Sequence, residues 1–386
     1  MSSIHIYGRF EDLPEVFLDL FDDAAAANDF SLTLPWFALL VETTLERYQR
    51  LRIYGVKRDA RPCLILPMYE ETNGKLMKTR RLTSLANCYT SLSGPVAGQV
   101  STGMGNILAS VVGAMIGEKP HWDSIDLHPL AIDDDVFHDL STALLAGGML
   151  VQRYFCFGNW YLNVGGQSYK TYFDGLPSKL RHTLIRQSRK LTLAKRLRVT
   201  ISTGENLDQG ISDYQQIYNS SWKTPEPFPS FIPGLIRLCA KQGWLRLGIA
   251  YIDDKPAAAQ IWIVHNQVAS IFKLAYDERF SNLSAGSLLT ASMMQHVIDV
   301  DKVGEVDYLT GDDSYKRDWM SHRRERWGIV AFNPHTLPGA VSAVRHLGAR
   351  HIKNLLGQIA GRVALLRENM GKIILGTISS DKQPNS

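Results

Sequence analysis

The sequence predicts an α+β protein of two lobes, each a mixed, mostly antiparallel sheet flanked by helices, with an additional C-terminal amphipathic helix. The chain has 386 residues, of which 45% are hydrophobic and 21% charged, and this is enough for two cored domains. Residues 1–160 contain a complete set of helix and strand patterns, and residues 178–335 contain a second set in a similar order. We therefore expect two lobes joined by a linker over 161–177, and a basic helix with a disordered tail over 336–386.

Apolar residues of the N-terminal lobe recur first with helical spacing and then with the alternation of strands. The turn Arg58-Asp59-Ala60 separates the first two strands. In chain order, the sequence predicts helices over 13–27 and 35–48, two strands within 51–71, a strand over 78–85, a helix over 106–116, a strand over 124–128 and a helix over 136–146.

The C-terminal lobe has its own series of patterns, which ends in a strand, a turn, a helix and a strand. In chain order, the sequence predicts helices over 178–198, 208–221 and 231–241, strands over 244–251, 256–264 and 268–276, a helix over 288–300, a strand over 305–310 and a short helix that carries Tyr315, Lys316 and Trp319. Small residues, Ser284-Ala285-Gly286-Ser287, precede the helix over 288–300. Such a turn lets backbone N–H groups and the positive helix end meet an anion, for example a pyrophosphate.

Basic residues are concentrated in two segments of a chain whose net charge is only +4. Residues 178–198 carry eight Lys or Arg and no acid, and residues 335–386 carry seven basic and two acidic residues. A soluble helix normally mixes signs, so the first segment is suited to a polyanionic substrate, a nucleotide-sugar diphosphate or a phospholipid surface, although a solvated face is the alternative. Arg186 and Arg189 on this helix are candidate substrate contacts.

The four cysteines are widely spaced and form no CxxC pair, which argues against a metal site and a disulfide framework and favours a reducing cytoplasm. We expect neither a signal peptide nor a transmembrane helix. Apolar residues recur every three or four positions over 340–374 with basic residues between them. This helix would either lie on the inner membrane surface or dock on the protein itself.

Two segments near the end of the C-terminal lobe carry a family resemblance. AYDERFSNLSAGSLL and then VDYLTGDDSYKRDW, within residues 275–319, resemble the closing half of the acyltransferase domain in the BioF2-like and CelD-like acetyltransferases. These form a branch of the GNAT superfamily related to the Fem peptidyltransferases. SKLRHTLIRQSRKL, which begins at residue 178, resembles the opening of the same domain, and the CelD-like family is built as two GNAT-type lobes in tandem.

The resemblance implies a cytoplasmic N-acyltransferase. It would move an acetyl or other acyl group from coenzyme A to an amine of an amino sugar or of an envelope or exopolysaccharide precursor, with acetyl-CoA as donor and without a metal. The usual GNAT pyrophosphate signature, Q/R-x-x-G-x-G/A, is reduced here to residues 282–287. The turn that opens a helix directly after the central strand predicts the donor phosphates at Ser284, Ala285, Gly286, Ser287 and Leu288. Lys273, on that strand and facing either side of the sheet, is a further candidate donor contact.

Acyl transfer also needs polarisation of the thioester carbonyl and removal of a proton from the amine. In the GNAT architecture, the strands expected here at 268–276 and 305–310 separate, and a free N–H of the first becomes an oxyanion donor. Asp307 is the candidate base, because a carboxylate in an apolar strand is costly unless it is paired or used; an ion pair is the alternative. Tyr308 and Tyr315 could protonate the leaving thiolate, or they are core aromatics.

Four further residues are candidate substrate contacts. Trp222 and Lys223 follow a helix, where the tryptophan could stack on a sugar or pack in the core. Gln260 is a lone amide in an apolar strand and indicates a polar cleft. Lys316 could contact an anion, or it is a surface lysine over a buried tryptophan.

Two other functions remain open at this point. A Fem-like aminoacyltransferase would use aminoacyl-tRNA, and this is the one case in which we expect nucleic acid as a partner. Such enzymes commonly carry a long helical arm, for which there is no room between Leu191 and Asp208. A non-catalytic accessory protein of polysaccharide biosynthesis would need no donor. The expected partner is otherwise a small anionic or amino-sugar substrate, with possible peripheral contact to the inner membrane.

Overall fold

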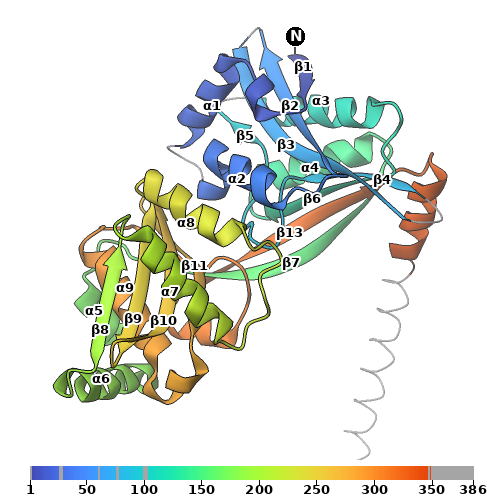
Figure 1. The fold of residues 1–386 in the computed structure, drawn as a ribbon. Coiled ribbons are helices and arrows are strands. Elements are labelled where there is room, and N and C mark those ends of the chain that lie inside the picture. Colours follow the sequence, from blue (N-terminus) through green and yellow to red (C-terminus); the bar gives the residue numbers. More distant parts are fainter. Residues whose placement is uncertain are drawn as a thin grey trace, which may run out of the picture.

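A single mixed sheet runs through the molecule (Figure 1). The computed structural model describes residues 2–25, 29–59, 61–74, 78–98, 103–346 and 348. In spatial order the strands are β1 (Ser2–Tyr7), β2 (Arg50–Arg58), β3 (Arg61–Asn73), β4 (Thr79–Ser84), β6 (Ser124–Ala131), β13 (His322–Phe332), β7 (Leu150–Asn163), β12 (Glu305–Asp307), β11 (Val268–Tyr276), β10 (Lys255–His265), β9 (Leu245–Ile252) and β8 (Leu197–Ser202). A short strand, β5 (Val96–Ala97), pairs with β3.

The two halves of the sheet show the same arrangement of strands. In each half an antiparallel series is followed by a helix and then by a strand that pairs in parallel, β4 with β6 in the first half and β11 with β12 in the second. The remaining pairs are antiparallel. The prediction of an α+β fold with a mixed, mostly antiparallel sheet is therefore confirmed.

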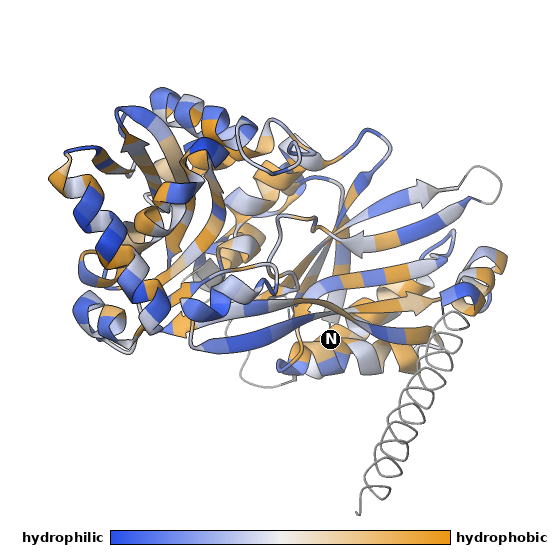
Figure 2. Cartoon of the chain, turned by 90° about the horizontal axis from the view of Figure 1, so that it is seen from below, coloured by the Kyte–Doolittle hydropathy of each residue, from blue (hydrophilic) through white to orange (hydrophobic). Residues whose placement is uncertain are grey.

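Helices cover both faces of the sheet. The helices are α1 (Glu15–Ala25), α2 (Leu34–Thr44), α3 (Met104–Gly117), α4 (Asp135–Ala146), α5 (Tyr169–Gly175), α6 (Ser178–Leu193), α7 (Leu207–Asn219), α8 (Phe231–Lys241) and α9 (Ala285–Asp299). One core joins α1, α2, α7 and α8 across both halves. On the other face, α3 and α4 pack on the first half, and α5, α6 and α9 pack on the second. The helices alternate between hydrophilic and hydrophobic colours in Figure 2, as amphipathic helices do.

The two longest antiparallel partners, β7 and β13, join the halves. β13 follows the second half in the chain but lies between β6 and β7 of the first. The C-terminal end of β7, a strand of the first half, pairs in turn with β12 of the second half through Tyr161, Leu162 and Asn163. The segment expected as a linker, 161–177, thus contains the end of β7 and the helix α5.

Two of the elements that end earlier than predicted do so near a residue in the left-handed conformation. The helix expected over 178–198 ends at Leu193, and Leu197 begins β8, because Lys195 takes a left-handed conformation (φ 53°) and β8 pairs with β9. The strand expected over 305–310 ends at Asp307, and Leu309 turns the chain with a φ of 52°.

The C-terminal helix is described only over residues 337–346 and at residue 348. There Ala343 packs on Val330 and Phe332 of β13. Most of the amphipathic helix expected over 340–374 lies outside the described residues. Among the helices that the structure describes, none combines the length and the apolar character needed to cross a bilayer.

Candidate active site

The gap beside β11 is the feature that positions the site. β11 and β12 pair in parallel only from Val268 to Ser270, opposite residues 305–307. Beyond this point β11 continues to Tyr276 with β10 on one side only. The register with β10 also shifts so that Phe272 has no partner, which is a β-bulge. Bulges re-aim side chains beside active sites, and the separated strands leave backbone N–H groups of β11 free for a ligand.

Two cavities adjoin this gap. The first, which we call the lysine cavity, has a volume of about 180 Å³ and is lined by Cys88, Tyr89, Lys223, Ile271, Phe272, Lys273, Leu274, Tyr308, Leu309, Thr310, Asp313, Tyr315 and Lys316. The second, the helix cavity, has a volume of about 430 Å³ and is lined by Leu180, Trp222, Gln260, Leu274, Ala275, Tyr276, Gly286, Ser287, Thr290, Tyr308, Tyr315, Asp318 and Trp319. Leu274, Tyr308 and Tyr315 line both cavities, so the cavities meet there.

The N-terminus of α9 faces the helix cavity. Ser284 precedes it in the left-handed conformation (φ 56°), and the first helical hydrogen bond runs from the Leu288 N–H to the Ser284 carbonyl at 3.0 Å. The N–H groups of Gly286 and Ser287 come before that bond and are open to an anion. Ala285 and Leu288 are buried, so their side chains belong to the core and only their backbone can serve the turn.

Gln260 holds this helix start against the sheet. Its Nε2 donates to the Gly286 carbonyl at 3.1 Å and to Thr290 Oγ1 at 2.7 Å, while its Oε1 accepts from Trp262 Nε1 at 2.8 Å. The amide is buried, with an exposed fraction of 1%. Gln260 therefore lines the helix cavity, and its side-chain amide positions the start of α9.

Trp222 lies at the mouth of the helix cavity. Its ring packs on Tyr276 with a centroid distance of 4.5 Å, and half of the residue is exposed. α6 lies beside the turn before α9, where Gln187 Nε2 donates to the Asn282 carbonyl at 3.2 Å. Arg186 and Arg189 are exposed on α6 and line neither cavity.

The two tyrosines meet at the gap between the cavities. Tyr308 is buried, and its ring contacts that of Tyr315 edge-on at 5.9 Å. Burial raises the pKa of both phenols, that of Tyr315 to about 12. Both phenols therefore carry their protons at neutral pH.

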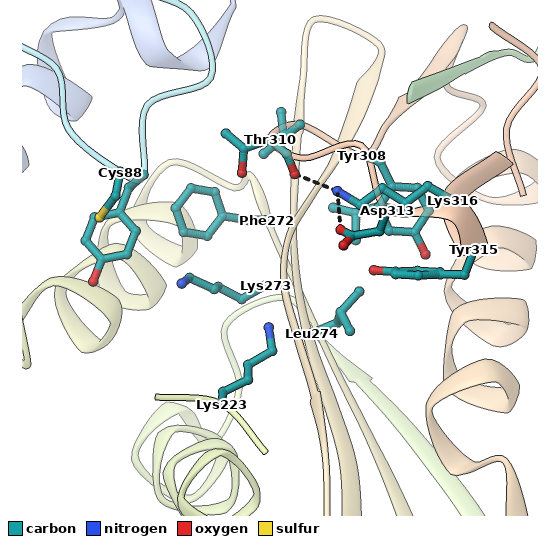
Figure 3. A pocket seen from close by; sticks show the side chains of 13 residues that line it. Cys88, Lys223, Phe272, Lys273, Leu274, Tyr308, Thr310, Asp313, Tyr315 and Lys316 are labelled. Carbon is teal, nitrogen blue, oxygen red and sulfur yellow. Dashed lines mark hydrogen bonds and ion pairs between the residues drawn. The ribbon is translucent and has the colours of Figure 1, made fainter. Parts of the chain in front are cut away.

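The wall of the lysine cavity combines residues from both halves of the sheet (Figure 3). Lys273 forms an ion pair with Glu226 at 2.8 Å, and its ammonium lies 4.8 Å from the centroid of the Tyr89 ring. The Tyr89 hydroxyl donates to Glu226 Oε2 at 2.6 Å. Lys273, a candidate donor contact on the central strand, thus lines the lysine cavity and not the helix cavity.

Lys316 is buried and fixes the loop after β12. Its ammonium donates to the carbonyls of Thr310 at 2.5 Å and Gly311 at 3.2 Å, and it lies 3.6 Å from Asp313. Burial lowers the pKa of this lysine. The side chain lines the lysine cavity, but its donors are already occupied by the loop.

Asp307 lines neither cavity. Its Oδ1 accepts hydrogen bonds from the Leu309 N–H at 2.6 Å and from Asn159, and its Oδ2 pairs with Arg324. Arg324 also pairs with Glu305 at 2.7 Å. These contacts are those of the ion-pair alternative, and they turn the carboxylate toward Arg324, Asn159 and the Leu309 N–H instead of either cavity.

Sequence reasoning did not find several residues at the lysine cavity, among them Cys88, Tyr89 and Glu226. Cys88 and Tyr89 follow β4, and Glu226 lies in the proline-rich loop before α8. For Glu226 the sequence did hold a signal of a site residue, because it is a charged residue between two prolines in that loop. Among the described residues, no three His, Cys, Asp or Glu side chains are grouped to hold a metal ion.

Comparisons with known proteins identify the domain and the fold. Residues 178–317 match the acetyltransferase (GNAT) domain family. A search of curated protein sequences found no match. The fold is similar to that of FemX, with a TM-score of 0.56, 10% identity, and coverage of 84% of this chain and 96% of FemX.

Two further solved structures share the fold. One is the C-terminal domain of a putative lysylphosphatidylglycerol synthetase from Agrobacterium fabrum, with a TM-score of 0.52, 12% identity, and coverage of 86% of this chain and 95% of that domain. The other is a conserved protein of unknown function from Bacteroides thetaiotaomicron, with a TM-score of 0.53, 10% identity, and coverage of 86% and 100%. At these identities the likeness concerns the fold.

Proposed function

We propose that this chain is an acyltransferase of the GNAT superfamily that transfers an acetyl or other acyl group from coenzyme A to an amine; the match of residues 178–317 to the acetyltransferase (GNAT) domain family and the FemX-like fold support this. The observation that carries the proposal is the pair of cavities that meet at Leu274, Tyr308 and Tyr315 where β11 and β12 separate. A thioester donor and an amine acceptor can approach such a gap from opposite sides.

The donor side is the helix cavity. The N–H groups of Gly286 and Ser287 at the start of α9 are suited to the pyrophosphate of coenzyme A, and the cavity leads from there to the gap. Glycine at position 286 presents only backbone to the cavity, where an added Cβ would make an ordinary van der Waals contact with the Tyr276 ring at 3.4 Å. The exposed basic residues of α6 lie beside this turn and suit the remaining negative charge of the donor.

The acceptor side is the lysine cavity. The neutral amine nitrogen attacks the thioester carbonyl carbon, a C–N bond forms, and the C–S bond breaks; the nitrogen gives up one proton to solvent water in the open cavity, and the sulfur leaves as the thiolate. Free N–H groups of β11 beyond Ser270 can stabilise the oxyanion, and Tyr315 can protonate the leaving thiolate. We propose an amino sugar or an envelope or exopolysaccharide precursor as the acceptor, which rests on the family resemblance.

The experiment that tests the proposal is calorimetric titration of acetyl-CoA into the parent and into Ser287→Asp. Ser287 is the third residue of α9. An aspartate at this position interacts favourably with the helix dipole, but its negative charge repels a bound phosphate. We expect affinity to fall by at least about tenfold, because hydrogen bonds to charged groups contribute about 1.5–3 kcal/mol each.

Thr171→Asp is the matched control. Thr171 is the third residue of α5, is exposed and lines neither cavity. It adds the same charge at the same helix position, so we expect parental affinity. Absence of acetyl-CoA binding by the parent, or equal loss in both variants, would contradict the donor site.

A further inference from the structure

The charges around the lysine cavity do not balance. Lys223, Lys273 and Lys316 line it together with Asp313. Lys316 is paired with Asp313, and Lys273 is paired with Glu226 just outside the lining. The ammonium of Lys223 makes no hydrogen bond and no ion pair with any other residue in the part of the chain that the structure describes. The Lys223 ammonium lies 5.8 Å from the centroid of the Trp222 ring, and three lysines against Asp313 and Glu226 leave one positive charge in excess at the cavity.

The positive charge of Lys223 is unfavourable in this position. Lys223 is half-buried in the loop between α7 and α8, and burial, followed by the positive charge of Lys273, lowers its pKa to about 8. Figure 3 shows Lys223 and Lys273 coming from different elements with their ammonium groups directed toward the same space. An anion in that space would compensate both burial and repulsion.

We propose that the lysine cavity binds a phosphate or carboxylate group of the acceptor, with Lys223 as its main contact and Lys273 beside it. This inference rests on the proposed function and narrows the acceptor to amines that also carry an anionic group. The anion belongs to the acceptor because the donor phosphates are assigned to α9, on the other side of the gap. The amine of the same molecule then reaches Leu274 and Tyr308, which line the cavity at the gap.

The first measurement compares three acceptors that differ in one group: glucosamine, its 6-phosphate, and its 6-carboxylate, the amino uronic acid. We expect the parent to prefer one or both anionic acceptors, and the two arms distinguish phosphate from carboxylate. In Lys223→Met the ratio of kcat/KM for the anionic acceptor to that for glucosamine should fall by about 10- to 100-fold, the equivalent of one charge-assisted hydrogen bond. Lys223→Arg should restore much of this ratio, because it keeps the charge.

Lys241→Met is the matched control. Lys241 is exposed at the end of α8, away from both cavities. We expect its rates to equal those of the parent. A fall in kcat with all three acceptors in Lys223→Met, at an unchanged ratio, would assign Lys223 to proton transfer and overturn the proposal.

The second measurement does not depend on turnover. In trace labelling with acetic anhydride at pH 8, about half of the Lys223 amine is unprotonated, whereas less than about 1% of an ordinary lysine is, so peptide mass mapping should show labelling at least about tenfold faster than at Lys241. Glucose 6-phosphate or glucuronate should slow the labelling of Lys223 at least threefold, and glucose should not.

Equal labelling of Lys223 with and without both anions, or equal protection by glucose, would overturn the inference. The outcome is separate from that of the proposed function. A parent that binds acetyl-CoA without favouring anionic acceptors would refute this inference alone, and a parent that binds no acetyl-CoA would refute the proposed function.

Discussion

Asp307→Asn separates a structural from a catalytic role at the junction between the two halves of the sheet. Asp307 is buried on β12, next to β7 and close to β13, and it accepts hydrogen bonds from Asn159, Arg324 and the Leu309 N–H. Breaking a buried ion pair costs about 3–5 kcal/mol. The asparagine keeps one acceptor oxygen and Arg324 keeps Glu305, so we expect the free energy of unfolding to fall by about 2–3 kcal/mol.

The assay is urea unfolding followed by both circular dichroism and tryptophan fluorescence, because two probes reveal whether the halves unfold together. Arg324→Met and the double variant complete a cycle, in which we expect a coupling of about 1–3 kcal/mol. Asp301→Asn is the matched control for activity, since Asp301 forms a comparably buried pair with Arg246 at 2.6 Å, away from both cavities.

If Asp307 is structural, turnover per folded molecule should fall by less than about tenfold in Asp307→Asn, and it should remain near the parental value in Asp301→Asn. General bases typically contribute about 10²–10⁴-fold to the rate. A loss of 100-fold or more with a change in unfolding free energy below about 0.5 kcal/mol would refute the structural reasoning and restore Asp307 as the base.

Two further predictions concern single side chains. Tyr315→Phe should lower kcat by about 100-fold with little change in acetyl-CoA affinity, and a thioester whose thiol has a low pKa should recover part of the loss; a decrease below threefold would exclude Tyr315 as the proton donor. His128 has its pKa lowered from 6.5 to about 4 by burial and by Arg81, despite lying 3.2 Å from Asp126. The unfolded chain therefore binds the extra proton between these values, so stability should fall as pH drops from 6.5 to 4, by up to about 3 kcal/mol more in the parent than in His128→Gln. The measurement is urea unfolding of both proteins across this pH range. An equal loss of unfolding free energy in the parent and in His128→Gln would contradict the prediction.

The antiparallel strands of the second half were predictable because local signals place their turns. Asp253, Asp254, Asn266 and Gln267 all take positive φ in the two hairpins, and asparagine and aspartate tolerate this conformation well. The gap beside β11 was expected from the family resemblance, and the structure shows it. The bulge at Phe272 has no sequence signal, since it appears only in the register with β10.

β7 and β13 were not predicted, for a different reason. β7 pairs with β13 and β12, and β13 pairs with β7 and β6. None of these pairs is joined by a short turn, so the sequence holds no hairpin signal for either strand. β7 mixes exposed and buried positions along its length and lacks the simple alternation of a one-sided strand. The same dependence on distant partners hid the contribution of Tyr89 to the site, because the loop after β4 reaches the lysine cavity only when the halves are assembled.

The exchange of β7 and β13 also constrains how the chain can fold as it is synthesised. β6 and β7 lie on either side of β13. The edge of β6 and the edge of β7 that face β13 therefore stay unpaired until residues 322–332 have left the ribosome. Contacts over such a separation are slow to form, and open edges are prone to wrong pairing. Once β13 is in place, a cut between Asn163 and Tyr169 would leave two fragments that remain interlocked through the sheet. The first half is thus completed by the last described strand, which makes assembly of the two halves one event.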